Sequence, residues 1–97
     1  NLCTKYFTQT RDYGIVTLDP VRVAQVVEGF DADWEHRDWL PGTDSGLLWS
    51  NANSRAHMAA FIDAAEKRLD VQHPKFVDAV ITDRLMAAAE RGVHVRI

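Results

Sequence analysis

The spacing of apolar and polar positions along this chain changes several times, and the first helical spacing begins at Asp19. Beyond it, apolar residues recur every three or four positions, which places their side chains on one face of an α-helix. Asp19 is a favoured N-cap and Pro20 suits the first helical position, so the helix is predicted to begin there and to end near Glu35 or His36. Its apolar face is expected to pack on a core. That face comprises Val23, Val27, Phe30 and Trp34.

Two further helices are predicted later in the chain. One follows a group of candidate cap residues at 51–54, and the other ends at Gly92, because glycine commonly terminates a helix just after its last turn. The apolar face of the first comprises Met58, Phe61, Ile62 and Ala65 and reaches Leu69. The apolar face of the second comprises Val77, Ile81, Leu85 and Ala88.

Short segments around these helices are predicted to be strands, namely residues 12–18, 47–49, 69–72 and 93–97. Strands and helices therefore alternate, which indicates an α/β fold with a largely parallel sheet and helices packed on it. If the last strand lies at an edge of the sheet, its unpaired backbone groups offer a surface for a homodimer.

Composition narrows the classes of function. The chain has 97 residues, enough for one domain or less, with 11 Lys and Arg against 14 Asp and Glu, a formal net charge of −3. That balance gives no electrostatic reason to bind nucleic acid. No run is long and apolar enough for a transmembrane segment, and no N-terminal leader is apparent. The single cysteine, Cys3, excludes an internal disulfide. The histidines at 36, 57, 73 and 94 lack metal-site spacing, so neither a metal nor a cofactor is expected.

Several stretches, taken in order, resemble the phospholipase D superfamily, above all its bacterial two-lobed, cardiolipin synthase-like members. Asn1-Leu2 resembles the end of the family's Gly-Ser-x-Asn segment, and residues 10–16 (TRDYGIV) resemble the strand that follows it. Residues 30–34 (FDADW) resemble the end of the helix that closes the first half. Four later stretches resemble the start of the second half, namely residues 48–50 (LWS), 62–65 (IDAA), 69–71 (LDV) and 89–97 (AERGVHVRI).

The resemblance implies a partial phospholipase D-like fold. Residues 1–36 would end the first lobe, 37–46 would form a linker, and 47–97 would begin the second lobe. The family's chemistry uses a His-x-Lys-x4-Asp motif in each half: one histidine attacks phosphorus to form a phosphohistidine, and the other protonates the leaving alcohol. Neither motif is present here, so we expect an interior segment that is inactive by itself.

Two residues are candidates for a functional role that the resemblance implies. Asp12 occupies the position at which the family keeps an acidic residue that accepts a hydrogen bond from a catalytic histidine, fixing its tautomer. Asn1 is a weaker candidate for contact with the substrate phosphate. The structural alternatives are a surface pair between Arg11 and Asp12 and a frayed terminus at Asn1.

One local string resembles half of the catalytic motif. His73-Pro74-Lys75 supplies His-x-Lys, but the position at which the aspartate is required holds Val80, and Asp78 comes two residues too early. Proline also fits poorly in a regular strand. We therefore predict a turn between a strand and a helix at His73.

The resemblance leaves several functions open. The parent protein would hydrolyse or transfer phosphodiesters, with phospholipids as the expected substrates, or it would be a nuclease of the same superfamily. A different class is a non-catalytic α/β interaction or scaffold module that associates through its terminal strand. The sequence does not decide between cytoplasm, periplasm and the membrane surface as the location of the parent protein.

Overall fold

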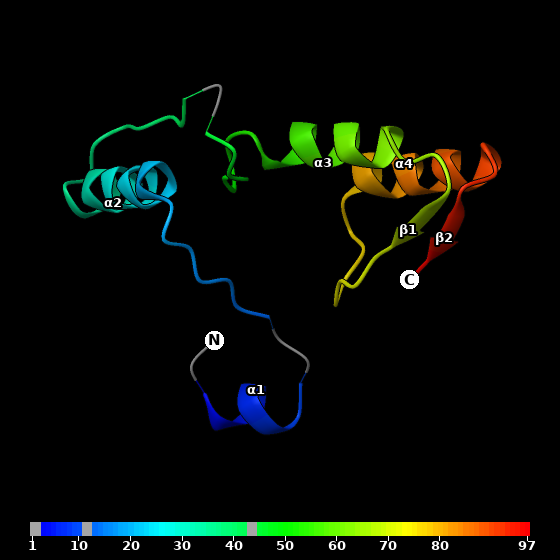
Figure 1. The fold of residues 1–97 in the computed structure, drawn as a ribbon, viewed down its shortest axis with the longest axis horizontal. Helices are drawn as coiled ribbons and strands as arrows, with labels where there is room; N and C mark the ends of the chain where they lie inside the picture. Colours follow the sequence, from blue (N-terminus) through cyan, green and yellow to red (C-terminus); the bar gives the residue numbers. More distant parts are fainter. Residues whose placement is uncertain (1–2, 11–12, 43–44) are drawn as a thin grey trace.

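Two helices and two strands form a small α/β unit in the C-terminal half of the chain. The computed structural model describes residues 3–10, 13–42 and 45–97. In this unit the two helices pack against each other on one side of a two-stranded parallel sheet (Figure 1). Leu69 lies opposite Val95 in its register. The four elements are α3 (Ser54–Asp63), β1 (Arg68–Asp70), α4 (Ala79–Glu90) and β2 (His94–Arg96).

Parallel strands need a crossover between them, and α4 provides it. The helix stops at Gly92, whose φ of +89° lies in the left-handed region that glycine adopts without steric cost. The chain then returns beside β1. Backbone bonds extend the ladder beyond the strands at both ends, from Val71 N to Arg96 O (2.8 Å) and from His94 N to Lys67 O (2.9 Å).

The core of this unit lies between the helices and the sheet. Its buried side chains are Ile62, Leu69, Leu85, Ala88 and Val93. Most of them belong to the apolar faces predicted from the sequence, and each large one contributes roughly 1.5–3 kcal/mol through burial. Arg91 strengthens the junction, because its Nη2 donates to the carbonyl oxygens of Ile62 (3.3 Å) and Asp63 (3.2 Å) at the end of α3.

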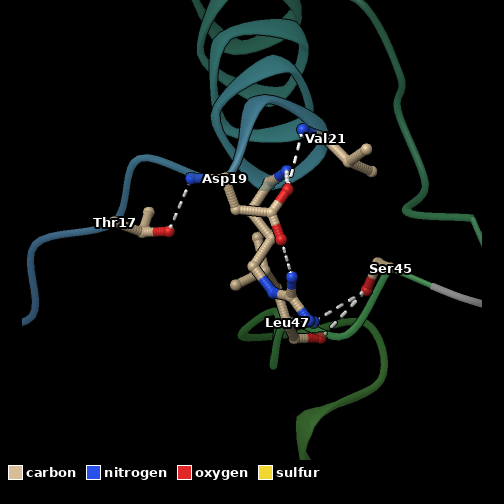
Figure 2. A network of polar contacts seen from close by, with 6 residues as sticks. Thr17, Asp19, Val21, Ser45 and Leu47 are labelled. Carbon is tan, nitrogen blue, oxygen red and sulfur yellow. Dashed lines mark hydrogen bonds and ion pairs between the residues drawn. The ribbon is translucent and has the colours of Figure 1, made fainter.

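Helix α2 (Pro20–Trp34) begins where the sequence predicts. Asp19 Oδ1 accepts hydrogen bonds from the backbone N–H groups of Val21 (3.0 Å) and Arg22 (3.4 Å), and its own N–H donates to Thr17 Oγ1 (3.2 Å), as Figure 2 shows. Desolvation alone would raise the pKa of the Asp19 carboxyl, but these hydrogen bonds and the Arg22 guanidinium hold that pKa below its ordinary value. The N-terminus of α2 is therefore well capped.

The N-terminus of α2 lies close to the segment that follows residue 44. A Cβ added at Gly46 would meet Arg22 Nη2 at 3.0 Å, and Gly46 has a φ of +63°. Next to it, the buried Ser45 hydroxyl donates to Leu47 O (3.0 Å) and accepts from Leu47 N (3.2 Å) (Figure 2). Glycine at position 46 adopts this positive φ without strain and leaves room for the Arg22 side chain.

The packing face predicted for α2 is wrong. Phe30 is 62% exposed and Trp34 77%, and Val23 and Val27 are also exposed, so the described residues leave the apolar stripe uncovered. The covered face instead contains Gly29, because a Cβ there would lie 3.2 Å from the ring of Trp49 and 3.3 Å from that of Trp39. The rings of Trp39 and Trp49 are in edge contact, with their centroids 4.7 Å apart, and they occupy the space that a larger side chain at position 29 would need.

Two predicted strands are absent from the described residues. Residues 13–18 are exposed and irregular, with no neighbouring strand among the described residues to complete a ladder. Residues 47–49 also form no strand, because the amide of Trp49 donates to Asn53 Oδ1 (2.7 Å) and the carbonyl of Leu47 accepts from Asn53 Nδ2 (3.3 Å). A short helix that the sequence analysis did not predict, α1 (Thr4–Thr8), has no buried residue. The fold is mixed α/β with a small sheet.

The N-terminal elements lie apart from the C-terminal unit (Figure 1). The radius of gyration is 16.3 Å, whereas a compact domain of about 100 residues has roughly 13 Å. Much apolar surface on α2 and in residues 13–18 is therefore exposed to solvent.

Candidate functional site

The two site residues predicted from the sequence, Asn1 and Asp12, lie outside the described residues. The residue after Asp12 is described, and it reaches the C-terminal unit. Tyr13 Oη donates to Gln72 Oε1 at 2.8 Å, across 59 positions of sequence. This bond ties the extended N-terminal segment to the loop that follows β1.

That loop borders a cleft in the C-terminal unit. The cleft measures about 750 Å³ and lies between α3, residues 71–78 and the first turns of α4. It opens beyond the carboxyl end of β1, the end of a parallel strand at which α/β proteins usually bind ligands. Its floor includes the core residues Ile62, Leu69 and Leu85, and its walls include Met58, Phe61 and Phe76.

An ion pair crosses one side of the cleft. Arg55 Nε lies 2.8 Å from Asp78 Oδ2, and Asp78 Oδ1 accepts the backbone N–H of Ile81 (3.2 Å) as the N-cap of α4. The backbone bond from Ile81 and the bond from Arg55, acting against desolvation, hold the pKa of the Asp78 carboxyl below its ordinary value. This carboxylate is already committed to two partners and is poorly suited to act as a general base.

The second acidic residue of the cleft, Asp70, is also neutralised by arginines. Arg68 Nη2 lies 2.8 Å from Asp70 Oδ2, and Arg96 Nε lies 2.9 Å from Asp70 Oδ1, so both strands contribute a cation. The hydrogen bond from Arg68, followed by the charge of both arginines, lowers the pKa of the Asp70 carboxyl despite some desolvation.

His73 lies in the loop between β1 and α4, so the predicted turn is confirmed. Its Nδ1 accepts the backbone N–H of Lys75 (3.2 Å), which leaves Nε2 as the N–H donor of the neutral ring. The ring lies edge-on to Phe76, with centroids 5.7 Å apart. Among the described residues, no side-chain hydroxyl, thiol or carboxylate forms a hydrogen bond with His73 that would make a nucleophile–base pair.

Neither Arg55 nor the cleft was predicted from the sequence. Asp78 is an N-cap signal, and α4 begins directly after it. Val77, predicted to lie on the apolar face of this helix, therefore precedes the helix and is 73% exposed. Nothing in the sequence indicates that α3 would bring Arg55 to this cap, because the two residues are 23 positions apart.

Other classes of site find no support in the described part of the chain. Among residues 3–10, 13–42 and 45–97, no three or more His, Cys, Asp or Glu side chains gather in a group able to hold a metal ion. Within the same residues, none of the helices combines the length and the apolar character needed to cross a membrane.

Comparison with known proteins yields no relative. No protein-family model, curated protein or solved structure matches this chain significantly. Among its described lining residues, the cleft combines apolar side chains with two arginine-paired carboxylates, one lysine and one histidine.

Proposed function

We propose that this chain is a non-catalytic portion of a phospholipase D-like phosphodiesterase or phosphatidyltransferase, which acts on phospholipid phosphodiesters through a phosphohistidine. The observation that carries the proposal is the ordered set of resembling stretches along the sequence. Two of these stretches overlap with β1 and β2, and the parallel pairing of these strands across α4 supports the proposal.

The finer fold belongs to the same proposal. In the parent protein, the two-stranded sheet would be part of a larger, largely parallel sheet with helices packed on it. The outer edge of each strand is unpaired among the described residues, so each has backbone groups available to further strands. The exposed stripe of α2 would be covered by the same larger structure.

Within this proposal Asp12 orients a catalytic histidine supplied by another part of the parent, and Asn1 contacts the substrate phosphate. This chain alone is inactive. The occupied Nδ1 of His73 and the committed carboxylates of Asp70 and Asp78 support that expectation.

The reading frame on either side of this segment tests the proposal. A His-x-Lys-x4-Asp motif shortly before Asn1 and another after Ile97 are expected, and flanks without them would contradict it. With the longer protein in hand, hydrolysis of a chromogenic phosphodiester should be lost in Asp12→Ala and retained in His73→Ala. Turnover by the 97-residue chain that His73→Ala abolishes would show instead that this segment is itself catalytic.

A second candidate is a non-catalytic interaction module, favoured by one observation. The apolar stripe of α2 is exposed over several turns, and such contiguous patches commonly mark association surfaces. Sedimentation velocity on the wild-type chain and on Phe30→Ser compares the candidates. Association that weakens in Phe30→Ser while the flanking motifs are absent would favour the module.

A further inference from the structure

We propose that the cleft between α3, residues 71–78 and α4 binds a small amphipathic anion. An alkyl or acyl body would lie against the apolar walls, and a carboxylate or phosphate head would lie at Lys75 and His73. This inference does not depend on the proposed function, because it uses only residues of the C-terminal unit.

The walls of the cleft favour a ligand with an apolar body. Met58 and Phe76 are each 38% exposed and Phe61 is 70% exposed, although all three line a hollow above the core. The volume of about 750 Å³ falls within the range of roughly 300–1,000 Å³ that is usual for small-molecule sites. A ligand with an alkyl chain would remove this apolar surface from water.

The charges around the same cleft favour an anionic head group. Each of its two carboxylates is already paired with arginine: Asp78 with Arg55, and Asp70 with two others. Lys75 also lines the cleft, and among the described residues no carboxylate lies within ion-pair distance of its ammonium group. Among the described residues, these two carboxylates face three arginines and Lys75, and Lys75 is the one of these four cations with no carboxylate partner, which favours an anion beside it.

His73 adds a directed donor beside that charge. Since its Nδ1 accepts the N–H of Lys75, its Nε2 carries the proton and can donate to an anionic oxygen. A positive charge with one N–H donor in the same loop is a suitable partner for a carboxylate or a phosphate monoester.

Methionine methyl NMR on the 97-residue chain provides a direct test. The chain has two methionines: Met58 lines the cleft, whereas Met86 lies on α4 outside it. We expect octanoate or octyl phosphate, titrated below micelle formation, to shift the Met58 signal saturably and to leave Met86 in place. The tighter of the two probes identifies the head group. Octanol should bind more weakly for lack of charge, and butyrate for lack of an apolar body.

Two lysine variants test the head group separately. Lys75→Gln should weaken octanoate binding about three- to fivefold, while Lys67→Gln, at the opposite end of β1, should bind as the wild type does. Unchanged methyl dispersion verifies that both variants are folded. The proposal is overturned if neither probe shifts Met58 saturably, if Met86 shifts in parallel with it, if octanol equals octanoate, or if the two lysine variants behave alike.

Discussion

Arg55 Nε lies 2.8 Å from Asp78 Oδ2, so a single ion pair joins the first turn of α3 to the residue that caps α4. The other oxygen of the same carboxylate holds the N–H of Ile81. The Asp78 side chain thus caps α4 and links this cap to α3.

Replacing Asp78 should separate these two roles. Asp78→Ala removes both the cap and the ion pair, and it should lower the thermal midpoint by a few degrees because an N-cap bond is lost. Asp78→Asn keeps a capping oxygen and loses only an exposed ion pair, so its effect should be smaller. Circular dichroism melts measure both, with Asp83→Ala, inside α4, as the control. Equal midpoints for Asp78→Ala and the control would contradict the capping role.

Stability should fall in acid because of three carboxylates. The pKa values of Asp19, Asp70 and Asp78 are all held below the ordinary value of 3.8 by their partners in the folded chain. Their stabilising contribution is therefore complete above that pH and is lost as the pH falls through the lowered values. Urea midpoints should therefore decrease between about pH 5.5 and pH 3. Asp78→Asn should flatten this dependence.

The core of the C-terminal unit should be sensitive to truncation at Leu85. This side chain is 4% exposed, so Leu85→Ala should lower the free energy of unfolding by about 2–4 kcal/mol through lost burial and the remaining cavity. Leu40 is 80% exposed and provides a matched control, since Leu40→Ala removes the same atoms without opening a core. Urea denaturation measures both variants. A similar loss of unfolding free energy in Leu85→Ala and Leu40→Ala would contradict the position of Leu85 in the core.

Gly92 should tolerate substitution poorly even though space is available. A Cβ there meets nothing within 4 Å, but the φ of +89° is one that L side chains rarely adopt. Gly92→Ala should therefore cost about 1 kcal/mol of unfolding free energy. Gly14 also has open space and lacks a positive φ, so Gly14→Ala should be close to neutral. Thermal melts of Gly92→Ala and Gly14→Ala measure the cost of the added methyl group with and without a strained backbone.

The sequence predicts best those features that depend on local chemistry. The start of α2 at Asp19 follows from one carboxylate and one proline, and the end of α4 follows from Gly92. Strands β1 and β2 overlap with the predicted segments, and Ile62, Leu85 and Ala88 reach the core as their helical spacing indicates, whereas Leu69 reaches it from β1 because α3 already ends at Asp63.

The features that the sequence did not predict depend on partners far away in the chain. The apolar stripe of α2 is evident, but local spacing cannot show that two tryptophans from a later segment would cover Gly29 instead. Residues 47–49 have strand-forming side chains, yet Asn53 takes the backbone groups that a ladder would use. The cleft needs Arg55 and Asp78 together, and the packing of α3 on α4 determines their distance.

The parallel pairing of β1 with β2 also restricts the order of folding. The two strands cannot pair across a tight turn, because α4 separates them in the sequence. The chain must first return along α4 to the start of β1 before β2 can pair with it. Closing that loop is the slow entropic step, and a preformed α4 shortens the search. Residues that nucleate α4, Asp78 among them, should therefore affect the refolding rate more than residues within the strands do.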